Sequence, residues 1–362
     1  MPLEPLDNDS KARSGWERMI GLSSRRAPDY ITASDELRPG PYAREIAVML
    51  GELGLAGVFC VAGVPTLGFA TDIDAEQLDR LHALLWNQAL LGALVVVRDD
   101  QVLVFSLDKR PQTTEGGLDL RLVETLSLLT DGPSLREMLE RVEAGSYWRA
   151  YADHFGPEQR IDMVLLANIA ETQRRLASDI GVEPAQALIM QTIFVAYLED
   201  RAIIPENIFL KMSSGRHRTF AEIMSNGEVD AFYDLFIYLK GALNGNVFTA
   251  PGLLDDGEYA APELQRHHLA TLATFRTGRE DMVTGQGRFF GYDFRFIPIG
   301  LISAVYDRFL ATEGQKEART APSIRRCFSP IWWSSSAGQK LATRVSRRAP
   351  FSIPHAAPAS SL

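Results

Sequence analysis

The sequence has little cysteine, no long hydrophobic run and no excess of positive charge, and each shortage excludes a class of protein. Cys60 and Cys327 are its only cysteines, too few and too far apart for a disulfide-stapled secreted domain. No apolar run reaches the roughly 18 residues that span a bilayer, and the N-terminus has no secretory hydrophobic segment. The net charge of −9 gives the whole chain no basic field for nucleic acid. We therefore expect a cytoplasmic protein without membrane contact, in which any DNA contact comes from a local patch.

What the sequence does contain is an ordinary globular composition, with 46% hydrophobic and 23% charged residues. Its charge is unevenly distributed. Residues 1–318 hold 30 Lys and Arg against 46 Asp and Glu, a net charge of −16, whereas residues 319–362 hold seven basic residues and no acidic one. This basic tail has neither helical nor strand periodicity. It is therefore a basic nucleic-acid-binding arm, a disordered tail, or sequence that was never selected as protein.

The first part of the chain predicts a small α/β domain after a flexible N-terminus of residues 1–38. We place this domain at residues 39–112, in the order α-β-β-α-β-β. Asp74 and Gln77 have the spacing of a capping box, which marks the start of its second helix. The strands are expected at 57–62, 66–70, 94–97 and 102–105, the last two forming a hairpin around Asp99 and Asp100.

The following region, residues 118–317, predicts a mainly α-helical domain. Seven apolar or small residues follow helical spacing between Ala185 and Tyr197 and form a core stripe. Further helices are expected from Val229 to Leu243 and from Pro298, a favoured first helical residue. The fold class is thus α+β: a small α/β domain, then a helical domain, then a disordered, non-native tail at 318–362.

Candidate catalytic groups are few, and we predict no catalytic, cofactor-binding or metal-binding residue. Adjacent His267 and His268 are expected to point to different faces of a solvated helix. A magnesium-dependent nuclease would need clustered carboxylates with a lysine. The residues of the α/β domain that could supply such a set are Asp99, Asp100, Asp108 and Lys109, although aspartate is also favoured in turns for backbone reasons.

A short basic cluster gives the sequence its candidate DNA-contact residues, because cationic side chains can bind the phosphates of a nucleic-acid backbone. The alternative is a solvated loop, which the acidic surroundings favour. The cluster consists of Lys211, Arg216, His217 and Arg218.

Five strings, in this order, resemble the region that precedes the catalytic core of large N6-adenine DNA methyltransferases of type IIG-like restriction-modification systems. The resemblance covers roughly residues 40–317, and it implies double-stranded DNA as partner and S-adenosylmethionine as cofactor of the intact parent enzyme. The strings are Gly-Val-Pro-Thr-Leu at 63–67, Leu-Leu-Trp-Asn-Gln at 84–88, Phe-Val-Ala-Tyr-Leu-Glu-Asp-Arg-Ala-Ile-Ile-Pro at 194–205, Leu-Asn-Gly-Asn-Val-Phe at 243–248, and Phe-Arg-Phe-Ile-Pro-Ile-Gly-Leu-Ile-Ser-Ala-Val-Tyr-Asp-Arg-Phe-Leu at 294–310.

The chain lacks the motifs that perform the chemistry in this family. These are a Phe-Tyr-Thr-Pro segment, an Asp-Pro-Ala-Cys-Gly-Ser-Gly loop that binds the cofactor, and an Asn-Pro-Pro-Tyr loop that holds the flipped adenine. A shifted reading frame accounts for their absence. When the third base of each codon is read with the first two of the next, residues 351–361 permit Leu-Asp-Pro-Ala-Cys-Gly-Ser-Gly-Ile-Phe. With the same shift, residues 319–336 permit a segment containing Ala-Phe-Tyr-Thr-Pro.

We therefore expect a fragment of an adenine-N6 DNA methyltransferase, truncated by a frameshift near residue 318 and inactive alone, with no cofactor of its own. The missing methyltransferase core is its expected packing partner. Two alternatives remain open at this point. One is a non-catalytic DNA-binding or partner-binding scaffold, and the other is a divergent nuclease built on the α/β domain.

Overall fold

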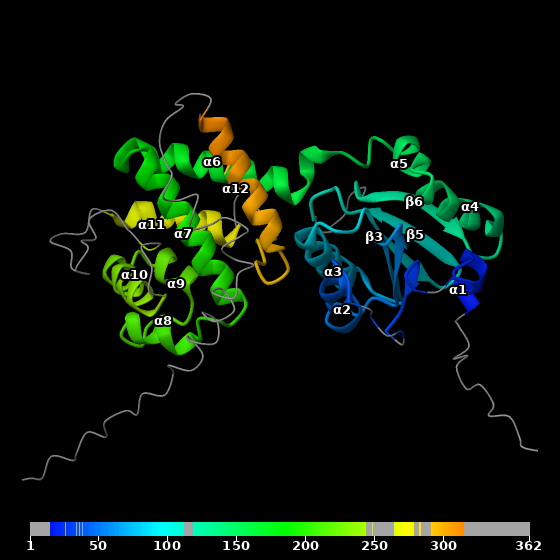
Figure 1. The fold of residues 1–362 in the computed structure, drawn as a ribbon, viewed down its shortest axis with the longest axis horizontal. Coiled ribbons are helices and arrows are strands. Elements are labelled where there is room, and N and C mark those ends of the chain that lie inside the picture. Colours follow the sequence, from blue (N-terminus) through cyan, green and yellow to red (C-terminus); the bar gives the residue numbers. More distant parts are fainter. Residues whose placement is uncertain are drawn as a thin grey trace, which may run out of the picture. The chain divides into compact units, whose positions relative to one another are not determined.

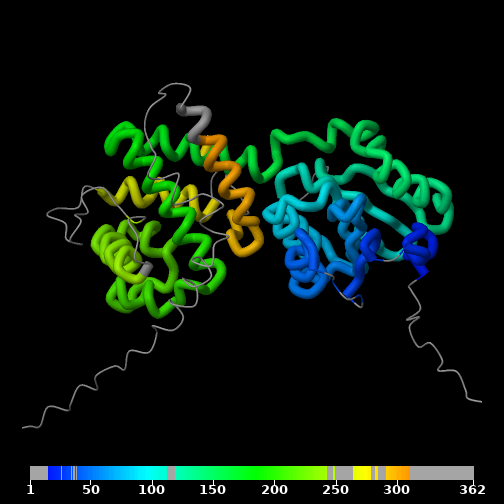
Figure 2. Tube along the Cα trace, viewed as in Figure 1, coloured from blue at the N-terminus to red at the C-terminus, as the bar shows by residue number. Residues whose placement is uncertain are grey.

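A computed structural model describes residues 15–25, 27–33, 35, 37, 39–111, 119–243, 248, 264–278, 282–283 and 291–314 (Figure 1). The chain divides into two compact units, Met1–Val164 and Leu165–Leu362, and its path can be followed in Figure 2. The unit boundary falls within the first turn of helix α6 (Ile161–Ile180). The expected disordered tail at 318–362 lies outside the described residues.

The first unit is built on a six-stranded mixed sheet whose strands lie in chain order, β1 to β6. All neighbouring pairs are antiparallel except β3 and β4, which are parallel and are joined through helix α3. The predicted hairpin is confirmed, since Arg98 pairs with Gln101 and leaves a two-residue turn. The strands are β1 (Tyr30–Ile31), β2 (Gly57–Val61), β3 (Val64–Thr71), β4 (Ala93–Arg98), β5 (Gln101–Ser106) and β6 (Leu122–Ser127).

Helices cover both faces of this sheet (Figure 1), because alternate side chains of each strand point to opposite faces. On β4, Leu94 and Val96 face a core shared with α2 (Ala43–Gly51) and α3 (Ala75–Gln88). Val95 and Val97 face a second core shared with α1, α4 and α5. These three helices are α1 (Gly15–Ile20), α4 (Gly132–Glu143) and α5 (Ser146–Ala150), and a 3-10 turn, η1 (Pro157–Gln159), follows them.

The capping box predicted for α3 is confirmed. The Asp74 carboxylate accepts the backbone N–H of Gln77 at 2.8 Å, and the Gln77 side chain accepts the backbone N–H of Asp74 at 2.9 Å. These two bonds satisfy N–H groups that the first turn of a helix leaves without intrahelical partners.

Two expectations for the first unit are wrong. Residues 15–20 and 30–31 form α1 and β1 rather than a flexible segment, because Ile20 and Tyr30 are fully buried in the core. The sheet-containing domain also does not end at residue 112. Strand β6 extends the sheet past residue 112, pairing with β5, and Glu124 on it accepts hydrogen bonds of 2.6 Å from Tyr147 and Tyr151.

The second unit is mainly helical, as expected, and is organised around α7 (Val182–Asp200). Every residue of the predicted stripe on α7 is buried, and so are Phe194 and Val195 on its other sides. A helix that is apolar all round lies in a core rather than on a surface. The remaining helices are α8 (Glu206–Met212), α9 (Phe220–Ser225), α10 (Val229–Leu243), α11 (Arg266–Thr277) and α12 (Ile299–Gly314). No helix in the described ranges is long and apolar enough to cross a membrane.

Candidate functional site

The predicted DNA-contact residues lie together at the end of α8 and in the loop before α9, but most of them form ion pairs with acidic side chains. Arg216 Nη1 lies 2.7 Å from Glu228 Oε1, and His217 Nε2 lies 3.4 Å from the same oxygen. Arg218 Nη1 lies 3.2 Å from Glu206 Oε1. Lys211 is exposed in the last turn of α8.

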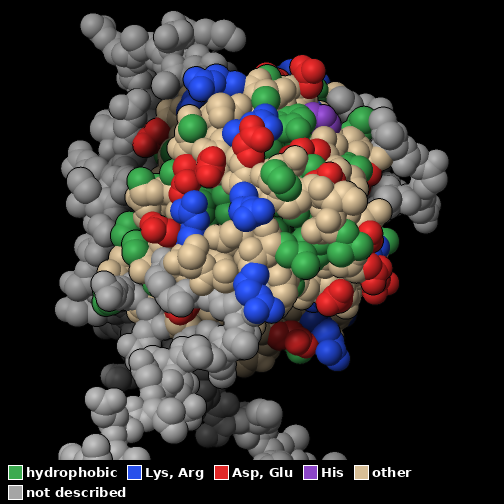
Figure 3. All heavy atoms as spheres, turned by 90° about the vertical axis from the view of Figure 1, so that its right-hand side faces the viewer, with side chains coloured by type: hydrophobic (Ala, Val, Ile, Leu, Met, Phe, Trp, Pro, Cys, Tyr) green, Lys and Arg blue, Asp and Glu red, His purple; other side chains and the backbone are tan. Residues whose placement is uncertain are grey.

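The cluster carries little net charge as a result. Its three cations, Lys211, Arg216 and Arg218, lie among three carboxylates, those of Glu206, Glu228 and Glu222, the last accepting the backbone N–H of Arg218 at 2.7 Å. Phosphate binding depends on uncompensated positive charge, since affinity comes from releasing counterions. Mixed charge is not confined to this cluster, because basic and acidic side chains are also interspersed on the face of the first unit that Figure 3 shows.

The carboxylates considered for a nuclease do not converge. Asp99 and Asp100 form the turn before β5, whereas Asp108 follows the other end of that strand. A strand rises about 3.3 Å per residue, so six residues place these ends roughly 20 Å apart. Lys109 Nζ instead donates a 2.7 Å hydrogen bond to the carbonyl of Asp153. No divalent ion can be shared across that separation, and the arrangement does not support a nuclease site from these four residues.

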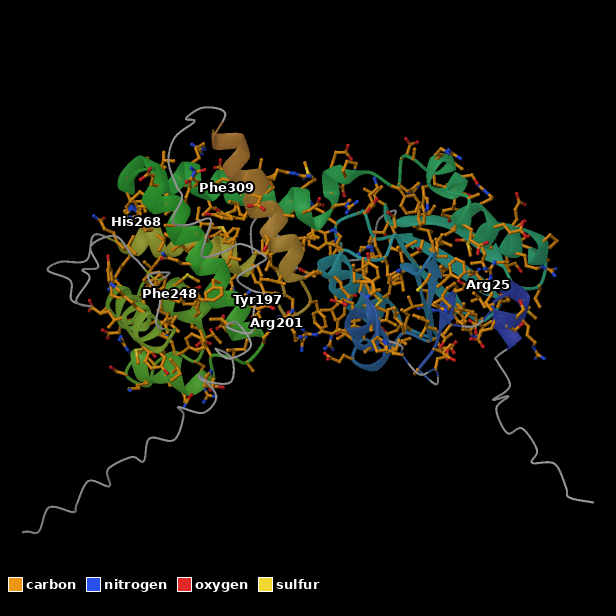
Figure 4. The ribbon with its side chains drawn as sticks, in the orientation of Figure 1. Arg25, Tyr197, Arg201, Phe248, His268 and Phe309 are labelled. Carbon is orange, nitrogen blue, oxygen red and sulfur yellow. The ribbon has the colours of Figure 1, made fainter. Side chains whose placement is uncertain are left out.

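The adjacent histidines do not point to different faces, contrary to expectation. The Nε2 atoms of His267 and His268 lie 2.8 and 3.2 Å from the same oxygen, Asp179 Oδ2 in the last turn of α6. His268 lies in the first turn of α11, and its Nδ1 accepts the backbone N–H of Gln265 at 3.0 Å. That bond turns the ring back toward Asp179, so both rings lie side by side with centroids 4.0 Å apart. Figure 4 labels His268 on α11.

These three side chains place possible metal ligands within 4.8 Å of one another, but their hydrogen bonds fit a structural role better. Because His268 Nδ1 is an acceptor, the neutral ring carries its proton on Nε2. That proton is donated to Asp179, and a protonated nitrogen cannot ligate a metal. Asp179 and His267 alone are exposed and too few for a tetrahedral zinc site. The two hydrogen bonds lower the pKa of Asp179, and burial lowers the pKa of His268.

A largely buried charge cluster joins the end of α7 to α11 and to the chain before α12. Arg276 Nη2 contacts Glu199 Oε2 at 3.3 Å and also Asp200 Oδ1. Asp200 Oδ2 accepts the backbone N–H of Phe294 at 2.8 Å, and the Arg276 guanidinium lies over the Phe294 ring, 5.5 Å from its centroid. Burial raises the pKa of both carboxyl groups. Tyr197 and Arg201 lie on the same end of α7 (Figure 4).

Sequence reasoning missed Arg276 and Asp179, because nothing near them in the chain indicates partners 76 and 88 residues away. In the sequence, Glu199 and Asp200 stand out only as part of the string at 194–205. The arrangement can hold helices together by buried ion pairs, and it contains no nucleophile paired with a base. No family model, no curated protein and no solved structure matches this chain.

Proposed function

We propose that this chain is the amino-terminal part of a site-specific adenine-N6 DNA methyltransferase of a restriction-modification system, followed by out-of-frame residues from about 318. The observation that carries the proposal is in the sequence. Two methyltransferase motifs, Phe-Tyr-Thr-Pro and Asp-Pro-Ala-Cys-Gly-Ser-Gly, are permitted in one shifted frame and in their usual order. They come directly after five strings that are typical of the region preceding that catalytic core.

Contacts in the second unit support the proposal that two of these strings belong to one structural module. The strings at 194–205 and 294–310 are separated by about ninety residues, yet they meet where the Asp200 carboxylate accepts the N–H of Phe294. Arg276 joins the same contact from a third segment. These contacts give the two strings a role in packing, so the proposal does not require that their residues be catalytic.

The connection inside the parallel strand pair does not have the form of an S-adenosylmethionine loop. Cofactor loops of this kind need glycine between a strand and a helix, so that the backbone can approach the ligand. The strand-to-helix connection inside the parallel pair, from β3 to α3, runs through Asp72, Ile73 and Asp74 and has no glycine. We therefore propose that the chain has no methyltransferase activity by itself.

A methyl-transfer assay with matched reading frames tests the proposal. The purified chain is expected to transfer no tritiated methyl groups from S-adenosylmethionine to double-stranded DNA. The same gene, with one reading frame restored near codon 318 and continued downstream, is expected to produce a protein that labels adenine. Methylation by the printed chain, or a downstream frame that encodes no Asn-Pro-Pro-Tyr loop, would contradict it.

A gel-shift series separates this proposal from a DNA-binding scaffold. Because the basic cluster is neutralised by its acidic neighbours, changing Lys211 and Arg218 to Ala together is expected to leave DNA binding at low salt unchanged. A scaffold that uses this cluster would instead lose affinity and show a shallower dependence on salt.

A further inference from the structure

A pocket of about 380 Å³ opens in the first unit, where α3, the start of β4, the end of β5 and the chain around η1 meet. Such a volume lies at the lower end of the roughly 300–1,000 Å³ typical of small-molecule sites. Its lining combines aromatic rings with one carboxylate and one guanidinium. The residues that the argument uses are Trp86, Gly92, Asp108, Trp148, Phe155 and Arg160.

The pocket is held open by hydrogen bonds between its walls. Trp86 Nε1 donates to the carbonyl of Gln159 at 3.0 Å, and the Gln159 side chain accepts the backbone N–H of Arg110 at 3.3 Å. Ser106 Oγ donates to the carbonyl of His154 at 2.7 Å. The chain around η1 is therefore fixed to α3 and to the end of β5, which makes the pocket preformed.

Gly92 provides room for one aromatic wall. A Cβ atom at this position would lie 2.8 Å from Trp148 Cη2, closer than side chains tolerate, so the indole ring occupies the space that a side chain would take. Phe155 meets Trp148 edge to face, with centroids 4.8 Å apart. The rings on this wall are thus located by close packing.

Asp108 is only weakly paired within the fold. Its carboxylate receives no hydrogen bond from the described residues, and Arg160 Nε lies 3.9 Å away, beyond hydrogen-bond distance. Its side chain is only 23% exposed, and this burial raises its pKa. Solvent therefore reaches this carboxylate in the pocket, and a ligand that donates N–H groups would take the place of that solvent.

We propose that this pocket binds a planar nitrogen heterocycle with two adjacent N–H donors, the class to which guanine belongs. Two parallel N–H groups match the two oxygens of a carboxylate, and a flat ring can stack on indole and phenyl side chains. The surroundings also select against phosphate. Asp108, Glu158 and Asp162 outnumber the nearby cations Lys109 and Arg160, so the ligand is a base or nucleoside rather than a nucleotide.

Calorimetric titration of the full chain with four probes tests this assignment. Guanosine is expected to bind, and inosine, which lacks the second donor, is expected to bind at least about tenfold more weakly, because it leaves one carboxylate oxygen without a charge-assisted hydrogen bond. Adenosine, which places an acceptor beside its amino group, and guanosine 5′-monophosphate are expected to bind more weakly than guanosine as well. No guanosine binding at millimolar concentration, or equal affinity for all four probes, would overturn the proposal.

Two variants and a matched control locate the binding. Asp108→Asn is expected to weaken guanosine binding about tenfold while leaving the unfolding midpoint unchanged or higher, because the carboxylate accepts no hydrogen bond in the fold. Asp99→Asn, at the far end of β5, is expected to bind like the wild type. Gly92→Ala is expected to push Trp148 into the pocket and weaken every probe that binds. Unchanged guanosine affinity in Asp108→Asn and Gly92→Ala would place the binding elsewhere and refute the site.

Discussion

Each compact unit holds an arginine between two carboxylates, but the two arrangements differ in burial and in geometry. In the first unit, Arg121 is fully buried and holds Asp119 with a fork, its Nε at 2.9 Å from Oδ1 and its Nη2 at 2.8 Å from Oδ2. It also reaches Asp79 at 2.6 Å. In the second unit, Arg276 contacts both Glu199 and Asp200 through Nη2 alone.

The pKa values of the acids show what this difference means. Burial alone would raise the pKa of Asp119, but the hydrogen bonds from Arg121 outweigh it and lower that pKa. In the second unit burial prevails, and the pKa values of Glu199 and Asp200 are raised although Arg276 opposes the shift. A two-point fork compensates desolvation where a single shared nitrogen does not.

The largest expected effect comes from removing the better arginine. Arg121→Gln is expected to lower the free energy of unfolding by about 3–5 kcal/mol, because it leaves buried carboxylates without their partner. Urea unfolding followed by circular dichroism measures this loss. As a control, Arg295→Gln removes an exposed pair with Asp293 and is expected to change stability by less than about 1 kcal/mol. Equal losses in the two variants would contradict the comparison.

The next effect depends on pH and separates the two units. Burial, with a smaller contribution from Arg121, lowers the pKa of His82 to about 4, while the unfolded ring titrates near 6.5. The unfolded state therefore binds more protons between these values, and the first unit loses stability as the pH falls from 6.5 to 4, by on the order of 3 kcal/mol.

Hydrogen exchange measured on proteolytic peptides can detect this pH-dependent loss of stability in the first unit. Peptides from α3 and β5 are expected to exchange faster at pH 5 than at pH 7 after correction for intrinsic rates, and His82→Gln is expected to remove much of the change. The raised pKa values of Glu199 and Asp200 act in the opposite direction. As the pH falls, these carboxyl groups bind protons at a higher pH in the folded state than in the unfolded state. Their protonation therefore stabilises α7 and α11 at lower pH. A uniform response of both units would count against this account.

The smallest effect is expected at the weaker arginine. Arg276→Gln should lower the free energy of unfolding by about 1–3 kcal/mol, the range for buried groups left unsatisfied. The loss is expected to shrink as the pH falls, because carboxyl groups with raised pKa values become neutral. Urea unfolding at pH 8 and pH 5 measures both quantities. A loss that matches that of Arg121→Gln at both pH values would show that the fork has no advantage.

Much of the fold could be predicted from local patterns. The capping box of α3, the β4–β5 hairpin and the core helix α7 each depend on residues close together in the chain. Strand β6 could not be predicted in this way. It lies at the edge of the sheet, and its residues are mostly half-buried, so they lack the alternation of buried and exposed side chains that marks a strand. Its place is fixed by pairing with β5 and by the two tyrosines that hold Glu124.

The sites were less predictable than the fold, because they depend on contacts between residues that are far apart in the sequence. The basic cluster around Arg216 was visible in the sequence, but its neutralisation depends on Glu228 and Glu206 folding back onto it. Asp99 and Asp108 lie close together in the sequence, but the whole length of strand β5 separates them in space. The lack of a hydrogen-bond donor for Asp108 is a property of its surroundings, which no local pattern reveals.

The sequence by itself determined the order of a sheet-containing part and a helical part, the four strands β2 to β5, the helices α2, α3, α7, α10 and α12, and the resemblance that motivates the proposed function, because hydrophobic periodicity and capping are local. Only the tertiary structure decided which charges are compensated, that His267 and His268 share Asp179, and that aromatic rings and Asp108 line one pocket. Desolvation and hydrogen bonding depend on neighbours in space, and the hydrogen-bonded partners Asp200 and Phe294 lie 94 residues apart in the chain.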